Sequence, residues 1–136
     1  MNAHRPKGRF GACDRLRKRS DFTRVQNTGG RVTAPDFIFL MAPGPAGCES
    51  PRLGITASRR VGNAVVRNRA KRIVREAFRA TRSLWPSPFD LVVIVRRPLG
   101  DVSFDEVIDE WRVAAPRILR RYNQLERTPP PETAAS

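Results

Sequence analysis

The sequence has little of the residue types from which catalytic and metal sites are usually built. Its 136 residues include one histidine and two cysteines. Neither Cys13 nor Cys48 has a C-x-x-C partner or a neighbouring histidine, so we expect two free thiols and neither a disulfide nor a zinc site. Because His4 has no second imidazole to work with, we do not expect it to be a catalytic base or a metal ligand.

Long apolar runs are also missing. The longest, Leu91 to Val95, has the length of a strand and falls far short of the roughly 20 residues that a membrane-spanning helix needs. The first residues, MNAHRPKGRFGA, lack the apolar segment of a secretory signal. We therefore expect a cytoplasmic protein that does not bind membranes.

Acidic residues are few against an excess of basic ones. The chain has 26 lysines and arginines and 13 aspartates and glutamates, which gives a formal net charge of +13. Most of the cations are arginines, whose planar guanidinium suits phosphate and base contacts. This balance predicts a nucleic-acid partner. The length predicts one domain over residues 14–126, between a flexible basic tail at 1–13 and a disordered Pro-rich tail at 127–136.

The most informative stretch is Val61 to Arg82, VGNAVVRNRAKRIVREAFRATR, which has the pattern of an amphipathic helix. Apolar residues recur at three- and four-residue steps and form one stripe. Arg67, Lys71, Arg75 and Arg79 recur every four residues and form a second stripe, which Arg69 and Arg72 widen. Like charges four residues apart repel each other in the free protein, so this stripe indicates a polyanion-binding face more than a solvated one.

The remaining patterns predict an α+β fold, with a small mixed sheet packed by three helices in the order α-β-β-α-β-α. A first helix is expected after an N-cap at Ser20. A β region follows over residues 32–41 with Pro35 inside it, and further strands are expected at 52–58 and 89–96, on either side of the basic helix at 64–82. A capping box at Ser103 and Glu106 opens the last helix, which Pro116 is expected to kink or divide.

Two features allow more than one interpretation. The acids at the start of the last helix have the spacing of a metal-dependent nuclease site, but they also suit the helix dipole, and we favour the dipole interpretation; they are Asp101, Asp105, Glu106, Asp109 and Glu110. Four apolar side chains could line a cleft in which the bases of single-stranded RNA stack, but the alternation of side chains along a strand requires some of them in the core. They are Phe22, Phe37, Phe39 and Leu40.

The segment RLGITASRRVGNAVVRNRAKRIVREAFR, Arg52 to Arg79, closely resembles the protein subunit of bacterial ribonuclease P. The hallmark of that family is the RNR motif, which here begins at Arg67-Asn68-Arg69 and continues with the pattern R-N-x-x-K-R-x-x-R. The resemblance extends to RLRKRSDFTRV, DFIFL and FDLVVIVRRP, and so spans roughly Arg15 to Tyr122.

This resemblance implies a small basic subunit that joins a large catalytic RNA and assists removal of the 5′ leader from precursor tRNA. In that family the RNA performs the hydrolysis with bound Mg²⁺, so this chain is expected to hold no catalytic residue and no metal of its own. The family fold is an α-β sandwich with a left-handed β-α-β crossover that contains the RNR helix. One protein per RNA is expected.

The resemblance also implies which residues bind. Contacts to the catalytic RNA are expected from Arg59, Arg60, Asn63, Arg67, Asn68, Arg69, Lys71, Arg72 and Arg75. The leader is expected in a central cleft lined by Phe22, Gln26, Leu40 and Thr56. Apart from the resemblance, four cations run just ahead of the first helix and fit either a solvated tail or additional RNA contacts; they are Arg15, Arg17, Lys18 and Arg19. Many members carry aromatics where this chain has Gln26 and Leu40, so its grip on the leader is expected to depend more on Phe22, backbone contacts and charge.

Three functions are therefore compared. The first is a ribonuclease P subunit that binds the catalytic RNA and the leader. The second is a general RNA-binding or ribosomal-type protein, which would bind any strand with a similar affinity and a steep salt dependence. The third is a self-sufficient metal nuclease that uses the acids between Asp105 and Glu110.

Overall fold

The computed structural model describes residues 19–44, 50–86, 89–100 and 102–127. Within these ranges the chain forms three α-helices, two short 3₁₀ helices and four strands. In chain order they are α1 (Arg19–Thr28), β1 (Gly30–Thr33), β2 (Phe37–Pro43), β3 (Arg52–Thr56), η2 (Arg59–Val61), α2 (Ala64–Ala80), η3 (Arg82–Leu84), β4 (Phe89–Val95) and α3 (Phe104–Arg127).

The strands form one mixed sheet in the order β1-β2-β4-β3. β1 pairs with β2 and β2 with β4 in antiparallel fashion, whereas β3 and β4 are parallel neighbours. Two adjacent parallel strands need a long crossover between them, and here α2 supplies it. The predicted β-α-β unit is thus confirmed, and β4 lies inside the sheet as its near-continuous apolar sequence predicts.

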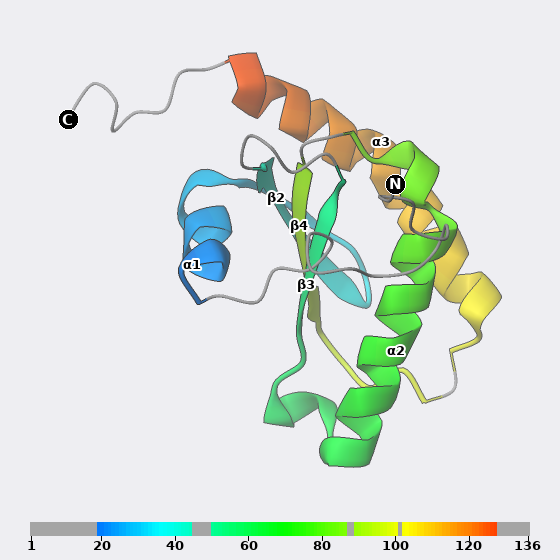
Figure 1. Cartoon of the computed structure of the whole chain (residues 1–136). Coiled ribbons are helices and arrows are strands. Elements are labelled where there is room, and N and C mark those ends of the chain that lie inside the picture. The colour runs from blue at the N-terminus through cyan, green and yellow to red at the C-terminus, as the bar shows by residue number, and fades with distance from the viewer. Residues whose placement is uncertain (1–18, 45–49, 87–88, 101, 128–136) are drawn as a thin grey trace, which may run out of the picture.

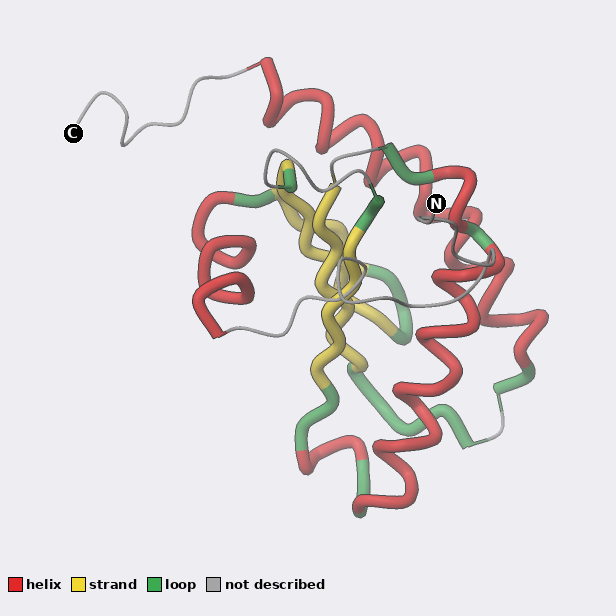
Figure 2. Tube along the Cα trace, in the orientation of Figure 1, coloured by secondary structure: helices red, strands yellow, loops and turns green. Residues whose placement is uncertain are grey.

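The helices cover the two faces of the sheet unequally. α1 lies alone on one face, and α2 and α3 lie together on the other (Figure 1). The tube view separates the same three layers, with the strands in the middle (Figure 2). Strand alternation explains both faces, because successive side chains of β2 and β4 point to opposite sides. Phe37, Phe39 and Met41 enter the core under α2 and α3, whereas Leu40 and Ala42 face α1.

The larger core is built around aromatic side chains. Trp111 of α3 is fully buried and meets the rings of Phe37 and Phe39 edge-on, with centroids 6.0 and 5.3 Å away. Trp85 stacks on Phe89, with centroids 5.5 Å apart. Such pairs stabilise the fold by about 0.5–1.5 kcal/mol each beyond the area they bury. The Trp111 pairs hold α3 against β2, and the ring of Tyr122 in α3 meets Phe89 of β4 edge-on, with centroids 5.0 Å apart.

The structure corrects the predicted order of elements at Pro35. The sequence predicts a single β region over residues 32–41. In the structure the chain reverses direction at Pro35 and forms the two antiparallel strands β1 and β2, so three strands precede α2. The turn is closed by the Ala34 N–H, which donates to the Phe37 carbonyl at 2.8 Å. A proline suits this turn because its fixed φ favours the turn and it has no N–H to pair.

Several predicted helix and strand ends also differ. α1 already includes Arg19, so Ser20 lies inside its first turn and is not the N-cap. α2 ends at Ala80 instead of residue 82, and β3 and β4 end at Thr56 and Val95. These shifts of one or two residues leave the topology unchanged.

Pro116 does not divide the last helix. α3 runs without interruption from Phe104 to Arg127. Pro116 is exposed, while Ala115 beside it and Ile118 after it are buried in the core. The missing hydrogen bond therefore falls on the solvent side, where water can bond the freed carbonyl, and packing of the buried side holds the helix together.

Candidate nucleic-acid interface

The start of α2 is fixed by a short turn that only certain residues allow. Gly62 has φ 149°, and a Cβ built there would lie 2.8 Å from the Cβ of Val66, so a side chain at this position would clash. Asn63 is the N-cap, and its Oδ1 accepts from the Val66 N–H at 3.0 Å. The sequence Gly-Asn thus determines where the basic helix begins and in which direction it runs.

The cations of α2 divide between different sides of the helix. Ala70, Val74, Ala77 and Phe78 face the core. Arg67, Lys71 and Arg75 are half-buried along one edge of this apolar stripe, and Asn68 and Arg72 are exposed beside them. The opposite edge, at Ala80, faces α3 across a cavity. The predicted stripe of Arg67, Lys71 and Arg75 therefore forms a continuous surface on the flank of α2 that faces away from α3.

Arg69 does not belong to this surface. Residues two positions apart lie about 160° apart around an α-helix, so Arg69 is on the other flank from Arg67 and Lys71. Its Nη1 donates to the Gly100 carbonyl at 3.0 Å and ties α2 to the segment that follows β4. The structure therefore gives the last residue of the Arg67-Asn68-Arg69 triplet a contact within the protein, and RNA binding by Arg69 stays a prediction.

Other predicted RNA contacts lie at the same end of the molecule. Arg59 and Arg60 are exposed in η2, directly before α2. The Nε of Arg67 is buried and has no hydrogen-bond partner among the described residues. A buried donor without a partner is unusual in a folded protein, and this one belongs to a guanidinium at the surface. In the part of the chain that the structure describes, the buried core residue Trp111 also has an unpaired ring nitrogen, so this feature alone does not mark a ligand contact.

The face of the sheet that carries α1 has a covered part and an open part. Val25 of α1 packs on Leu40, Ala42 and Val92, and all four are buried. Two residues further along β2 and β4, one residue from each of the four strands lies opposite its neighbour on this same face, which gives a row across the whole sheet. It consists of Thr33, Ile38, Ile94 and Thr56. The two threonines are exposed and the two isoleucines half-buried, so this row is the open part of the face beside α1 and is referred to below as the floor of the predicted cleft.

The predicted cleft residues lie on this face but are not equally accessible. Phe22 of α1 is half-buried and packs against the same apolar cluster as Ile38 and Ile94. Gln26 is exposed one helical turn further along. Thr56 ends β3 within the open row. Leu40 is only 7% exposed under α1, so little of its surface is available to a ligand.

Sequence reasoning missed three residues of the floor. Thr33, Ile38 and Ile94 were read only as parts of strands, but they complete the row that Thr56 begins. Alternation does predict that Ile38 and Ile94 share a face with Leu40 and Val92. The sequence does not reveal where α1 stops covering that face. The row lies at the carboxyl ends of β3 and β4, and Thr56 is three residues before Arg59, so this end of the predicted cleft leads into η2 and the start of α2.

The acids at the start of α3 have structural partners. Ser103 and Glu106 form the reciprocal capping box that the sequence predicts, with bonds of 2.9 and 3.1 Å. Glu110 accepts the Asp36 N–H at 2.8 Å, and burial raises the pKa of its carboxyl to about 7. No group of three or more histidine, cysteine or acidic side chains lies together as metal ligands in the described part of the chain. In the same ranges, no helix is long and apolar enough to cross a membrane.

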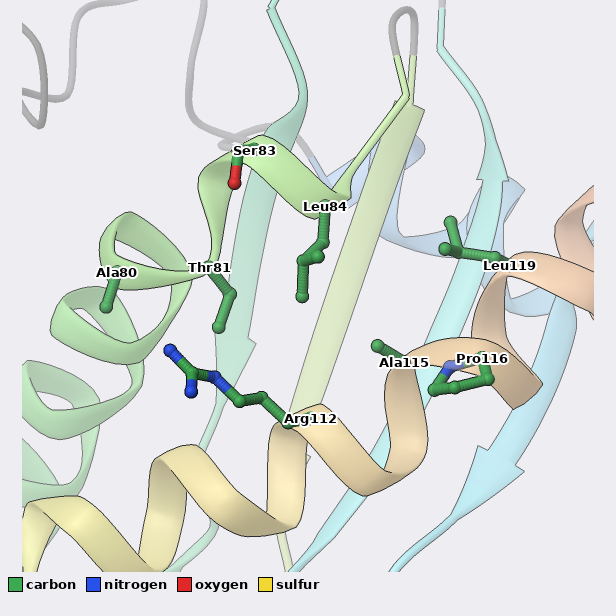
Figure 3. A pocket seen from close by; sticks show the side chains of 8 residues that line it. All are labelled: Ala80, Thr81, Ser83, Leu84, Arg112, Ala115, Pro116 and Leu119. Carbon is green, nitrogen blue, oxygen red and sulfur yellow. The ribbon is translucent and has the colours of Figure 1, made fainter.

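A cavity of about 410 Å³ lies on the other side of the sheet, between α2 with η3 and α3. Its walls are mostly apolar, and the Arg112 side chain points across it toward α2 (Figure 3). The other lining residues are Ala80, Thr81, Ser83, Leu84, Ala115, Pro116 and Leu119. The cavity is thus distinct from the cleft beside α1, and none of the predicted binding residues lines it.

Some predictions concern residues outside the described ranges. These are the basic contacts at Arg15, Arg17 and Lys18, the thiols Cys13 and Cys48, His4, Asp101, the N-terminal tail and residues 128–136 of the C-terminal tail; residue 127, where that tail was predicted to begin, still belongs to α3. Arg19 is the first residue of α1 and is exposed.

Comparison with known proteins identifies the family to which this fold belongs. The sequence matches the Ribonuclease P family model over residues 10–119. The ribonuclease P protein component of Bacillus velezensis is 39% identical over 93 residues, which are 68% of this chain and 78% of that protein. That of Desulforapulum autotrophicum is 38% identical over 111 residues, 82% of this chain and 93% of the relative. The solved ribonuclease P protein of Thermotoga maritima superimposes with a TM-score of 0.68 and 36% identity, covering 76% of this chain and 96% of that one. The chain shares its fold with these proteins and has a basic helix that begins at a Gly-Asn turn. It belongs to the ribonuclease P protein family.

Proposed function

We propose that this chain is the protein subunit of a ribonuclease P, in which it binds the catalytic RNA and the 5′ leader of precursor tRNA and assists removal of the leader. The observation that carries the proposal is the position of the open row, which ends at Thr56, three residues before the exposed Arg59 and Arg60 that precede α2. A strand lying in the cleft would continue directly toward an RNA bound to α2.

The basic flank of α2 is the surface proposed for the catalytic RNA. Arg67, Lys71 and Arg75 present their cations on one side, and Arg59 and Arg60 extend the positive charge past the helix N-terminus. Guanidinium groups bind phosphate through paired N–H donors, and release of counterions makes such binding favourable and salt-dependent. Asn63 is occupied as the N-cap and is proposed to act mainly by holding this end of α2 in place.

The cleft beside α1 is the site proposed for the leader. Its floor offers two isoleucine side chains flanked by threonine hydroxyls, and Phe22 stands at its wall. Unpaired bases stack on apolar and aromatic surfaces with little regard for sequence, which suits a ligand that differs from one precursor to the next. Gln26 and the hydroxyls provide hydrogen-bond partners at the rim.

We propose that this chain contributes no catalytic residue and that Mg²⁺ is bound mainly by the RNA. The acids of α3 support this view, because Glu106 and Glu110 are engaged in bonds to the backbone of their own chain. The chemistry of the metal would be to activate water for attack on the phosphodiester. One protein per RNA is proposed, and the substrate places the complex in the cytoplasm, where tRNA precursors are transcribed.

The test is cleavage of a 5′-extended precursor tRNA by the cognate ribonuclease P RNA at low Mg²⁺, with the protein, without it, and with the protein alone. We expect cleavage at the mature 5′ end only when RNA and protein are combined. Cleavage by the protein alone would identify a self-sufficient nuclease. Equal rates with and without the protein would leave only a general RNA-binding role.

A double variant tests the α2 surface by its binding to the catalytic RNA at several salt concentrations. Arg67→Gln with Lys71→Gln should reduce the slope of log affinity for the catalytic RNA against log salt by about 1.5, because two phosphate contacts are lost. Arg112→Gln is the matched control, since this arginine faces the cavity on the other side of α2. If the double variant unfolds, or if the control changes the slope equally, the assignment of the surface is wrong.

A further inference from the structure

Asp90 is a fully buried carboxylate on the face of the sheet that carries α1. Its two oxygens accept from Nε and Nη2 of Arg52, each at 2.8 Å, so β3 and β4 are joined by a bidentate pair. Oδ2 also accepts from Nη2 of Arg24, which belongs to α1. The other terminal nitrogen of Arg24 donates to the Pro43 carbonyl at the end of β2, at 3.0 Å. One buried acid thus connects α1 to two strands.

These charged contacts lie on both sides of Phe22 in the sequence of α1. Asp21 precedes it, with Oδ1 3.7 Å from Nη2 of Arg52, and Arg24 follows it. α1 also packs on the sheet through the apolar side chains of Phe22 and Val25. Apolar contacts have no preferred direction and tolerate sliding, whereas bonds between a guanidinium and a carboxylate fix distance and orientation. The position of α1 along the sheet is therefore set by its charged contacts.

That position decides how much of the cleft floor is open. α1 covers the residue row that contains Leu40 and Val92, and the next row, with Ile38 and Ile94, stays partly exposed. Adjacent side chains on one face of a strand are separated by about 7 Å, so a small shift of α1 along the strands would cover part of the open row.

We propose that Asp90 is a positioning residue for binding of the 5′ leader. Through Arg24 it holds α1, and with it Phe22, at the distance from Ile38 and Ile94 that a single strand requires. Asp90 itself is buried and touches no RNA. The inference rests on the proposed function, in which the cleft holds the leader.

The experiment measures dissociation constants of the assembled holoenzyme for a precursor tRNA with a leader and for the mature tRNA. Two variants weaken the tether, Asp90→Asn and Arg24→Gln. Arg24→Gln leaves the Arg52–Asp90 pair intact and so keeps the test valid if Asp90→Asn fails to fold. We expect the precursor to bind about tenfold more weakly and the mature tRNA to bind unchanged. Arg24→Lys, which keeps the charge beside Asp90, should restore part of the affinity.

A purely structural role would give a different pattern. Thr81→Val is the matched control, because it removes the buried acceptor of the Trp85 Nε1 donor, 3.1 Å away, on the far side of the sheet from α1. It should lower thermal stability and leave the ratio of the two dissociation constants unchanged. If Arg24→Gln changes that ratio no more than Thr81→Val does, the positioning role is refuted.

Phe22→Ala separates the inference from the proposed function. If Phe22→Ala also leaves the ratio unchanged, the cleft does not hold the leader, and the proposed function fails together with the inference. If Phe22→Ala weakens precursor binding and both tether variants do not, the cleft assignment stands and only the role of Asp90 is overturned.

Discussion

Ile38 of β2 and Ile94 of β4 stand directly opposite each other in the antiparallel register, and both side chains are half-buried beside α1. They form the apolar centre of the proposed leader cleft. Replacing either with serine removes a surface on which a base can stack, so Ile94→Ser should weaken binding of a leader-bearing precursor by about fivefold to tenfold. Mature tRNA should bind as before, measured by competition with the assembled holoenzyme.

The control for this prediction is Val113→Ser. Val113 is 73% exposed on α3, away from the cleft, so its replacement changes exposed apolar surface without touching the floor. A loss of precursor affinity in Val113→Ser as large as in Ile94→Ser would show that the effect does not arise in the cleft.

Aromatic residues introduced at Leu40 and at Ile38 should have opposite effects. Leu40 is buried under α1, so Leu40→Phe overfills a packed site and should cost about 1–3 kcal/mol of unfolding free energy with no gain in leader binding. Ile38→Phe places a ring on the open row and should strengthen precursor binding by about threefold or more. Urea denaturation and precursor binding distinguish the two, and tighter binding by Leu40→Phe would contradict the assignment.

The Asn63 cap predicts a stability effect that is separate from RNA contact. Asn63→Ala removes the acceptor of the Val66 N–H and should lower the free energy of unfolding by about 1 kcal/mol. Asn63→Ser retains a capping oxygen and should recover most of this stability. If both variants keep full stability but lose affinity for the catalytic RNA, Asn63 acts as a direct contact and not as a cap.

Glu110 predicts a pH dependence of stability. Burial raises the pKa of this carboxyl from 4.5 to about 7, against the opposing effect of the hydrogen bond from the Asp36 N–H. The folded chain therefore binds the proton more tightly than the unfolded chain. The resulting stability is fully present below pH 4.5 and is lost as the pH rises through about 7. In urea titrations the fall in stability over this window should be smaller in Glu110→Gln, and equal slopes in the two proteins would contradict the prediction.

Sequence patterns were sufficient for the features that depend on local periodicity. The basic stripe of α2, the capping box of α3 and the β-α-β unit follow from spacing along the chain, because backbone geometry fixes which side chains share a face. The turn at Pro35 was missed because one proline between two apolar strands fits both an interrupted strand and a hairpin. The continuity of α3 through Pro116 depends on packing that its own sequence does not contain.

The sequence by itself determined the charge of this protein, the face of α2 that carries it, and the family resemblance through the RNR motif. Only the tertiary structure decided that Leu40 is covered while Ile38 and Ile94 are open, that Arg69 bonds Gly100 on the flank away from Arg67, and that Asp90 joins α1 to the sheet. The physical reason is distance along the chain. Arg24 and Asp90 are 66 residues apart, and no periodic pattern relates positions that meet only when the whole sheet has formed.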